Sequence, residues 1–122
     1  MVDEMHYEEF RKTLENLVAE AVEDVVVLVE GARDEKALRL AGVRAKIVYV
    51  SRFREAVEMM PRPRKIILLL DFDSEGMKTV KRVSRLLRQM GYEVDESYHR
   101  RLRVLKRFGI TTVEALAKLL EV

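Results

Sequence analysis

Cysteine is absent from this sequence of 122 residues, which excludes disulfide bonds and thiolate metal sites. Long hydrophobic runs are absent too, because no apolar segment approaches the roughly twenty residues that a membrane-spanning helix requires. The acidic opening, Met1-Val2-Asp3-Glu4, lacks the order of charged and then apolar residues that marks a signal peptide. We therefore expect a cytoplasmic protein with no membrane contact.

Glycine and proline are scarce, with five and two residues, yet 48% of the residues are apolar. The sequence shows no internal repeat, low-complexity tract or flexible linker, and its length fits one domain with a real core. The lack of cysteine, together with 36% charged residues of both signs, favours a thermophilic source.

The net charge is only +2, but the charges are unevenly distributed. From Asp3 to Glu35 there are eleven acidic and three basic residues, whereas from Lys78 to Arg107 there are ten basic and three acidic residues. A basic half on a nearly neutral protein favours a polyanionic partner. The alternative is a solvated surface rich in arginine.

Hydrophobic periodicity predicts the order of the elements. Apolar residues at helical spacing predict a leading helix over 10–21, and buried strands are predicted at 25–29, 46–50 and 65–70. Further helices are predicted at 34–40, at 51–59 with Ser51 as its cap, at 75–90, at 98–108 and at 113–120 with a Thr111–Glu114 capping box, and a short fourth strand at 92–94. This alternation predicts an α/β domain with a central parallel sheet of about four strands flanked by helices.

Carboxylates follow two of the predicted strands. Glu30 ends the first, and Asp71 and Asp73 end the third. If the first strand lies between the other two, these acids meet at the carboxyl edge of the sheet, where open α/β sheets place their sites. Two carboxylates about 5 Å apart repel by roughly 3 kcal/mol at an effective dielectric constant near 20. A hard divalent cation would relieve this repulsion, and oxygen ligands favour magnesium, manganese or calcium over zinc. Alternatively, the acids are turn residues or helix caps.

Two motifs resemble those of the Toprim domain family. The segment Val29-Glu30-Gly31-Ala32-Arg33-Asp34-Glu35-Lys36-Ala37-Leu38 is similar to the first Toprim motif, and Leu69-Leu70-Asp71-Phe72-Asp73-Ser74-Glu75-Gly76 is similar to the second, Asp-x-Asp-x-x-Gly. The family includes topoisomerases, bacterial-type primases and a ribosomal RNA maturation nuclease. The resemblance covers 25–92, and the whole chain looks like the small stand-alone Toprim proteins of archaea.

The resemblance implies a Rossmann-like Toprim fold, with 1–24 as an N-terminal helix packed on the domain, 25–95 as the Toprim core and 96–122 as a C-terminal helical extension. It implies that Asp71 and Asp73 bind Mg²⁺ or Mn²⁺, and that Glu30 is the general acid or base and an additional metal ligand. Asp34, Gly31, Gly76 and Glu75 are then expected around these ligands. Topoisomerases have arginine where this chain has Ser74, and no strand-cleaving tyrosine domain is evident, so topoisomerase activity is not expected.

Basic residues after the second motif are candidates for nucleic-acid binding. These are Lys78, Arg82, Arg85, Arg100 and Arg101, followed by Arg103, Lys106 and Arg107. Each could contact a backbone phosphate; alternatively, they form solvated helix surfaces with internal ion pairs. His6 and His99 have no partner at metal spacing and are expected at the surface.

Three functions remain open at this point. The first is metal-dependent hydrolysis or transfer at a nucleic-acid phosphodiester, which would make the chain a nuclease-like enzyme. The second is a module that binds metal and RNA or DNA, in which turnover needs a partner, either another protein or a second copy in a homodimer, or does not occur at all. The third is a receiver-like signalling domain, which also places acids after its first and third strands but needs further strands ending in Thr or Ser and in Lys.

Overall fold

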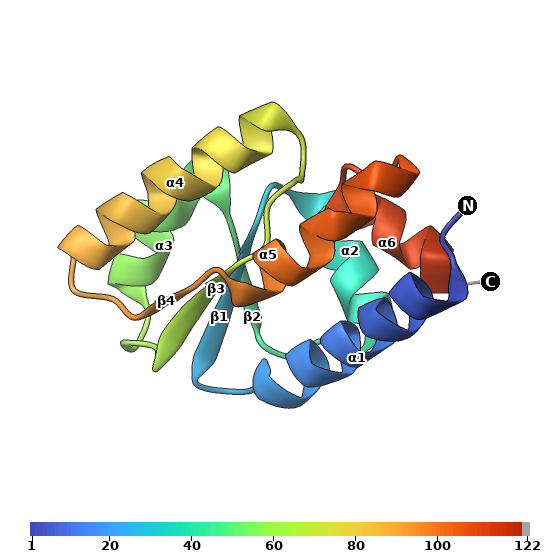
Figure 1. The fold of residues 1–122 in the computed structure, drawn as a ribbon. Coiled ribbons are helices and arrows are strands. Elements are labelled where there is room, and N and C mark those ends of the chain that lie inside the picture. Colours follow the sequence, from blue (N-terminus) through green and yellow to red (C-terminus); the bar gives the residue numbers. More distant parts are fainter. Residues whose placement is uncertain (121–122) are drawn as a thin grey trace.

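A four-stranded parallel sheet forms the centre of the protein (Figure 1). The computed structural model describes residues 1–120. The strands are β1 (Val25–Val29), β2 (Lys46–Tyr49), β3 (Lys65–Leu68) and β4 (Val94–Asp95), in the order β2-β1-β3-β4. Each neighbouring pair is parallel. The expected α/β class and the central position of the first strand are therefore confirmed.

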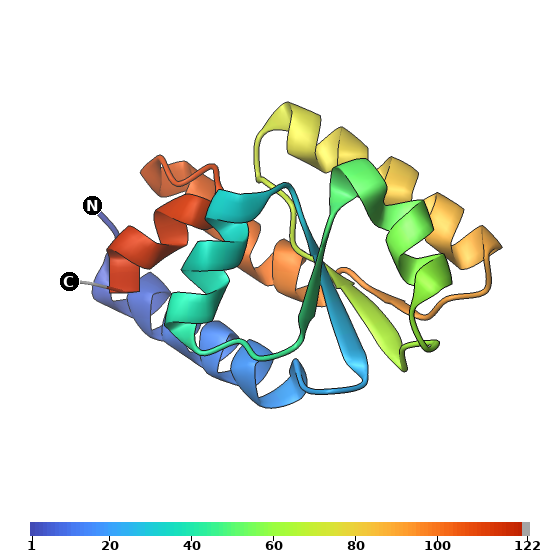
Figure 2. The ribbon, with the colours of Figure 1, turned by 180° about the vertical axis from the view of Figure 1, so that it is seen from behind.

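Helices cover both faces of the sheet. They are α1 (Glu4–Glu20), α2 (Ala32–Ala41), α3 (Phe53–Met59), α4 (Ser74–Gln89), α5 (Ser97–Leu102) and α6 (Val113–Leu120), with 3-10 helices η1 (Val50–Arg52) and η2 (Arg103–Phe108). Helices α3 and α4 lie on one face, and α1, α2, α5 and α6 lie on the other (Figures 1 and 2). Figure 2 shows β2 at the edge of the sheet.

The continuous apolar run of β1 is explained by burial on both faces, since all five of its residues are buried. Val25, Val27 and Val29 pack in one cluster, with side chains from α1, α2, α5 and α6, and Val26 and Leu28 pack in the other, with α3 and α4. Full burial of such a side chain stabilises a fold by about 1.5–3 kcal/mol. Packing on both faces of the sheet therefore stabilises β1.

The last two helices complete the cover of one face of the sheet. Tyr98 and Leu102 of α5 and Val113 and Leu116 of α6 are all buried in the cluster that also contains Leu17 of α1. Helix α6 packs against α2, and α5 packs against α1. The segment 96–120 therefore shares its core with the segment 1–24 and with the strands. None of the helices within 1–120 combines the length and apolar character needed to cross a membrane.

Several predicted boundaries were wrong. Ser51 lies in η1 and does not cap α3, which begins at Phe53 without a side-chain cap. The cap of α6 is Thr112, whose Oγ1 accepts the Ala115 N–H at 3.1 Å, and not Thr111. The predicted helix over 98–108 is α5 followed by η2, the fourth strand begins at Val94, and the leading helix begins at Glu4.

Candidate functional site

The site lies where the sheet reverses its direction of growth. The chain runs from β1 outward to β2, and from β3 outward to β4 on the opposite side. The carboxyl ends of β1 and β3 are neighbours, with Leu28 aligned with Leu68. Such a switch point is where open parallel sheets bind ligands, because the connections on either side diverge and leave room there. The expected adjacency of the strands before Glu30 and Asp71 is confirmed.

Glu30 follows β1 and is partly exposed. Burial raises the pKa of its carboxyl group, and the nearby negative charges of Asp71, Asp34 and Asp73 raise the pKa further. The backbone amide of Asp71 opposes this shift in part. The pKa of Glu30 thus depends on acids from two separate segments of the chain, its own turn after β1 and the loop after β3.

Asp71 is held by the C-terminal helices. Its Oδ1 accepts the backbone N–H of Val113 at 3.2 Å, at the first residue of α6. Its carbonyl oxygen lies 3.1 Å from Nε2 of His99, and the next residue, Phe72, donates its N–H to the Thr111 carbonyl at 2.7 Å. Burial raises the pKa of Asp71, and the Val113 N–H opposes this shift.

Asp73 has a second role as the N-cap of α4, because its Oδ1 accepts the Gly76 N–H at 2.7 Å. The alternative that this acid is a helix cap is therefore correct for Asp73. The cap uses only one oxygen of the carboxylate, however, and the residue is exposed. Phe72, between the two aspartates, is fully buried. Asp71 and Asp73 thus reach the surface on either side of a residue that anchors the loop in the core.

The two motif glycines have different surroundings. A Cβ on Gly76 would lie 2.1 Å from the Asp71 carbonyl oxygen. The first turn of α4 therefore packs directly on the backbone of Asp71, the candidate metal-binding residue. A Cβ on Gly31 would have no atom within 4 Å. The close approach that requires glycine at position 76 is made to the protein's own backbone.

Asp34 is buried, with only 6% of its surface exposed. Its Oδ2 accepts the Gly31 N–H at 3.1 Å at the start of α2. Burial is the main cause that raises its pKa, opposed by hydrogen bonds from the backbone of Gly31 and then of Glu114. The start of α6 therefore lies close to both Asp34 and Asp71, and its Val113 N–H donates to Asp71. Glu75, also expected at this site, is exposed and pairs with Lys78 at 3.8 Å.

The four carboxylates Glu30, Asp34, Asp71 and Asp73 have no ion-pair partner within 4.0 Å among residues 1–120. Within the same residues, no three acidic or histidine side chains are gathered closely enough to form a complete metal cluster. The donor chemistry fits a hard divalent ion, since all donors are oxygens and the charges of Asp34 and Asp73 raise the pKa values of both Glu30 and Asp71. Mg²⁺ commonly takes one or two carboxylates and completes its sphere with waters and substrate phosphates.

His99 was expected at the surface, and this was wrong, because only 2% of it is exposed. It packs against Phe72 with ring centroids 5.3 Å apart, and burial lowers its pKa. Its position next to Tyr98 and three residues before Leu102 places it on the buried side of α5, and this spacing could have revealed it. The backbone donor at Val113 has no sequence signal, because any residue except proline supplies an N–H.

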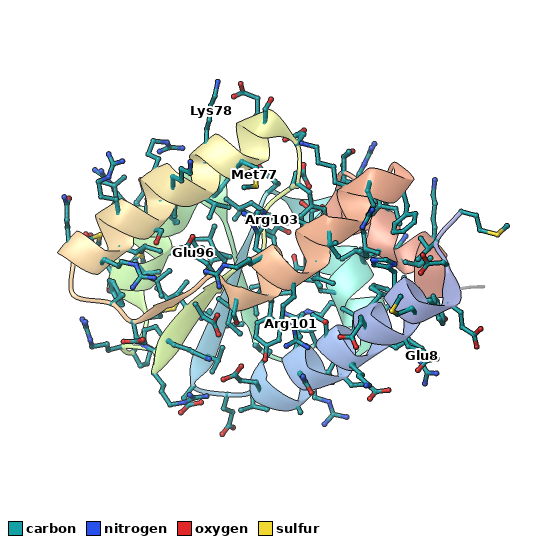
Figure 3. The ribbon with its side chains drawn as sticks, viewed as in Figure 1. Glu8, Met77, Lys78, Glu96, Arg101 and Arg103 are labelled. Atoms are coloured by element: carbon teal, nitrogen blue, oxygen red, sulfur yellow. The ribbon has the colours of Figure 1, made fainter. Side chains whose placement is uncertain are left out.

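The predicted nucleic-acid residues are divided by the fold. Arg82 lines a hollow of about 360 Å³ with Arg52 and Arg54, beside the end of β2, and sequence reasoning missed those two arginines. Arg100 lines a different hollow, beside Phe72. Arg85 is exposed on α4. Arg101 does not join either group, since its guanidinium lies 5.9 Å from the centre of the Tyr98 ring and points toward α1 (Figure 3).

Fold and site together define an α/β protein with a parallel sheet and unpaired carboxylates at its carboxyl edge. No protein-family model matches the sequence. The UPF0292 protein of Pyrococcus abyssi is 32% identical over 116 residues, which cover 93% of this chain and 88% of that protein. The UPF0292 protein of Thermococcus sibiricus is 35% identical over 90% of both chains. The chain belongs to the UPF0292 family.

A solved structure also resembles this fold. A protein from Aquifex aeolicus superposes with a TM-score of 0.72 at 29% sequence identity, covering 86% of this chain and 95% of that one. The family relatives, which include a protein of Archaeoglobus fulgidus at 29% identity, come from thermophilic archaea, in line with the archaeal and thermophilic character expected from the sequence. The Toprim assignment stays a prediction.

Proposed function

We propose that this protein is a Mg²⁺-dependent Toprim protein that acts on the phosphodiesters of RNA or DNA, either hydrolysing them or transferring the phosphoryl group to another hydroxyl. One observation supports this most: four carboxylates without a cationic partner in residues 1–120 lie around the switch point between β1 and β3. Such a group is costly for the folded protein unless a cation joins it. Binding of a cation would relieve the repulsion among these carboxylates, and the bound cation could then attract a polyanion.

Asp71 and Asp73 would hold the ion. Each uses its Oδ1 for a backbone N–H, from Val113 and Gly76 respectively, and so has its Oδ2 available. Both side chains are fixed by these hydrogen bonds before any ion arrives, which reduces the entropy lost on binding. Mg²⁺ or Mn²⁺ would neutralise charge on the phosphodiester and lower the pKa of a bound water.

Glu30 would act as the general acid or base, exchanging a proton with the attacking water or hydroxyl. Its carboxyl group is partly buried, and burial and the neighbouring acids shift its pKa upward, toward the range in which a carboxyl group exchanges protons with water near neutral pH. Asp34 is buried and hydrogen-bonded to Gly31, so it positions the turn after β1 and does not reach the substrate.

The experiment is a cleavage assay with structured RNA, single-stranded DNA and double-stranded DNA, each with EDTA, Mg²⁺ or Mn²⁺. We expect metal-dependent cutting or joining of at least one substrate, lost in the Asp71→Asn/Asp73→Asn double variant. Glu75→Gln is the matched control, since it removes one negative charge from an exposed residue of the same loop and should keep the activity. Metal-dependent activity that survives in the double variant would contradict the proposal.

A second function is favoured by a separate observation. Because residues 1–120 contain no complete metal cluster, the site would need ligands from a substrate or another chain. In that case the protein is a module that binds metal and nucleic acid, and a protein partner or a second copy completes the reaction. The receiver-like alternative is disfavoured, because the elements that follow β4 are α5, η2 and α6.

A further inference from the structure

A hollow of about 490 Å³ lies between the first turn of α4 and the segment formed by α5 and η2. Its lining residues are Phe72, Met77, Arg100, Arg103, Val104 and Lys106. Its volume is within the range of about 300–1,000 Å³ that is typical of small-molecule sites. It is therefore large enough to accept a group of the size of a nucleotide.

The cations of this hollow are available. Arg100, Arg103 and Lys106 are exposed, and none of them pairs with an acidic side chain of residues 1–120, whereas Lys78 and Arg88 of α4 do. Three cations on one short segment that have no acidic partner within residues 1–120 repel one another and attract an anion. The alternative of internally paired arginines, left open by the sequence, therefore does not apply to these three within the described chain.

The floor of the hollow is apolar. Met77 lies beneath Arg103, with Nη1 and Sδ 3.9 Å apart, and Figure 3 shows the two side chains approaching one another from α4 and η2. Val104 is 42% exposed. Because Arg103 already contacts Met77, a nucleobase would lie beside this pair and against Val104, where both methionine sulfur and arginine make favourable contacts with aromatic rings.

The hollow adjoins the acids through the chain itself. Phe72 stands between Asp71 and Asp73, and Met77 is in the turn that Asp73 caps. A nucleotide in the hollow would therefore place its neighbouring phosphodiester near the carboxylates. In a duplex the bases are stacked inward, so a base reaches such a hollow only from a single strand or after extrusion.

We propose that this hollow binds one unpaired nucleotide of a single-stranded nucleic acid, with the base over Met77 and Val104 and the backbone phosphates on Arg100, Arg103 and Lys106. This inference rests on the proposed function for its polyanionic substrate, but not on catalysis. It assigns the substrate class as single strands or unpaired regions, and it selects these three cations from the larger basic surface.

The experiment measures binding in EDTA, so that failure of metal-dependent cleavage leaves it unaffected. Fluorescence anisotropy would compare a labelled single-stranded oligonucleotide with the duplex of the same sequence over a series of salt concentrations. The variants are Arg100→Ala/Arg103→Ala and Met77→Ala, and the control is Arg44→Ala, an exposed cation that precedes β2 at the amino edge of the sheet and lies outside the hollow. Circular dichroism would verify that each variant is folded.

We expect the wild type to bind the single strand more tightly than the duplex. The double variant should lose about 1.4 units of salt slope, because each phosphate contact contributes about 0.7 for single strands. Met77→Ala should weaken binding about two- to tenfold with an unchanged salt slope. Equal binding of single strand and duplex, a double variant that behaves like Arg44→Ala, or no binding of either oligonucleotide would each overturn the proposal.

Discussion

At the scale of single residues, the loop from Asp71 to Gly76 combines structural and candidate functional roles. Asp73 caps α4 with one oxygen, and Asp71 uses one oxygen for the Val113 N–H. These bonds orient both carboxylates and leave one oxygen of each available. The hydrogen bonds to the backbone would explain these two aspartates even without a metal. Only substitutions that keep the hydrogen bonds and remove the charge, or the reverse, can therefore distinguish the structural role from metal binding.

Gly76→Ala tests the geometry of this loop. The added Cβ would lie 2.1 Å from the Asp71 carbonyl oxygen and 2.6 Å from its carbon, and backbone atoms cannot move aside as a flexible side chain can. We expect the free energy of unfolding to fall by about 1–3 kcal/mol. Thermal or urea unfolding followed by circular dichroism measures this change.

Gly31→Ala is the matched control for that variant. Its Cβ would meet no atom within 4 Å, and its φ of −173° is open to any residue. Stability should therefore change by less than about 0.5 kcal/mol. If Gly31→Ala destabilises the protein as much as Gly76→Ala, the close packing of α4 on Asp71 is not the cause.

Asp71→Asn should make the protein more stable in EDTA. Burial raises the pKa of Asp71 in the folded state, so the folded protein binds this proton more tightly than the unfolded chain. The charged form therefore lowers stability above the folded pKa, and stability returns as pH falls through that value. Asparagine is neutral, and its Oδ1 can still accept the Val113 N–H.

The readout is the melting temperature at neutral pH. In EDTA the melting temperature of Asp71→Asn should exceed that of the wild type. Added Mg²⁺ should raise the melting temperature of the wild type more than that of the variant, because a ligand stabilises the state that binds it. A variant that is less stable than the wild type in EDTA would show that the negative charge of Asp71 is already compensated within the protein.

At the scale of elements, a polar network joins α1, β3, β4 and α5. Lys65 of β3 contacts Glu20 and lies 2.7 Å from Asp95, and the Tyr98 hydroxyl donates to Glu20 at 2.5 Å. Hydrogen bonds from Lys65 and Tyr98 lower the pKa of Glu20. Burial alone would raise the pKa of Asp95, but the hydrogen bonds from Lys65 and Ser97 outweigh it and lower that pKa.

Lys65→Met should lower the free energy of unfolding by about 1–3 kcal/mol at pH 7, because two partly buried carboxylates then lose their shared cation. Since the pKa values of Glu20 and Asp95 are depressed in the folded state, the stability that they contribute is present above their ordinary values of 4.5 and 3.8. It is lost as pH falls through the folded values. Wild type and variant should therefore converge in acid.

Arg64→Met is the control for this network. Arg64 precedes Lys65, but its ion pair with Asp24 is exposed, with 51% and 59% of the two side chains accessible. Such pairs contribute about 0–1 kcal/mol. Urea unfolding at several pH values would compare the two variants. An equal loss in both, or a difference between Lys65→Met and wild type that is independent of pH, would contradict the assignment.

The elements also show what sequence reasoning can and cannot supply. The strands at 25–29 and 65–68 could be predicted because burial on both faces requires uninterrupted apolar runs. Caps were less predictable, because Thr111 and Thr112 both have a suitable hydroxyl and only the path of the chain selects Thr112. Glu30 and Asp71 could be placed at one edge from strand order, whereas the support of Asp71 by His99 depends on tertiary packing.

At the scale of the whole molecule, the C-terminal helices connect the acidic edge with the basic hollow. Helix α6 donates the Val113 N–H to Asp71 and begins close to Asp34, and the segment from α5 to η2 carries Arg100, Arg103 and Lys106. The segment 96–120 therefore both completes the core and borders the candidate site. Phe72 lines the basic hollow and stands between Asp71 and Asp73 in the chain, so the acids and the cations adjoin through this residue, which is the charge arrangement that a cation and a polyanion together would require.

Glu30→Gln separates an acid–base group from a metal ligand, and an enzyme from a binding module. If Glu30 transfers a proton, the variant should keep its fold, its metal affinity and its nucleic-acid binding, but lose activity about 10²–10⁴-fold. If Glu30 is mainly a ligand, calorimetry should show weaker metal binding, and a higher metal concentration should restore part of the activity.

Arg82→Ala/Arg85→Ala is the control, since it should weaken nucleic-acid binding and flatten its salt dependence without changing metal affinity. If the wild type binds nucleic acid but neither cuts nor joins it with Mg²⁺ or Mn²⁺, the module is the correct reading, and Glu30 then has no catalytic role in the isolated chain.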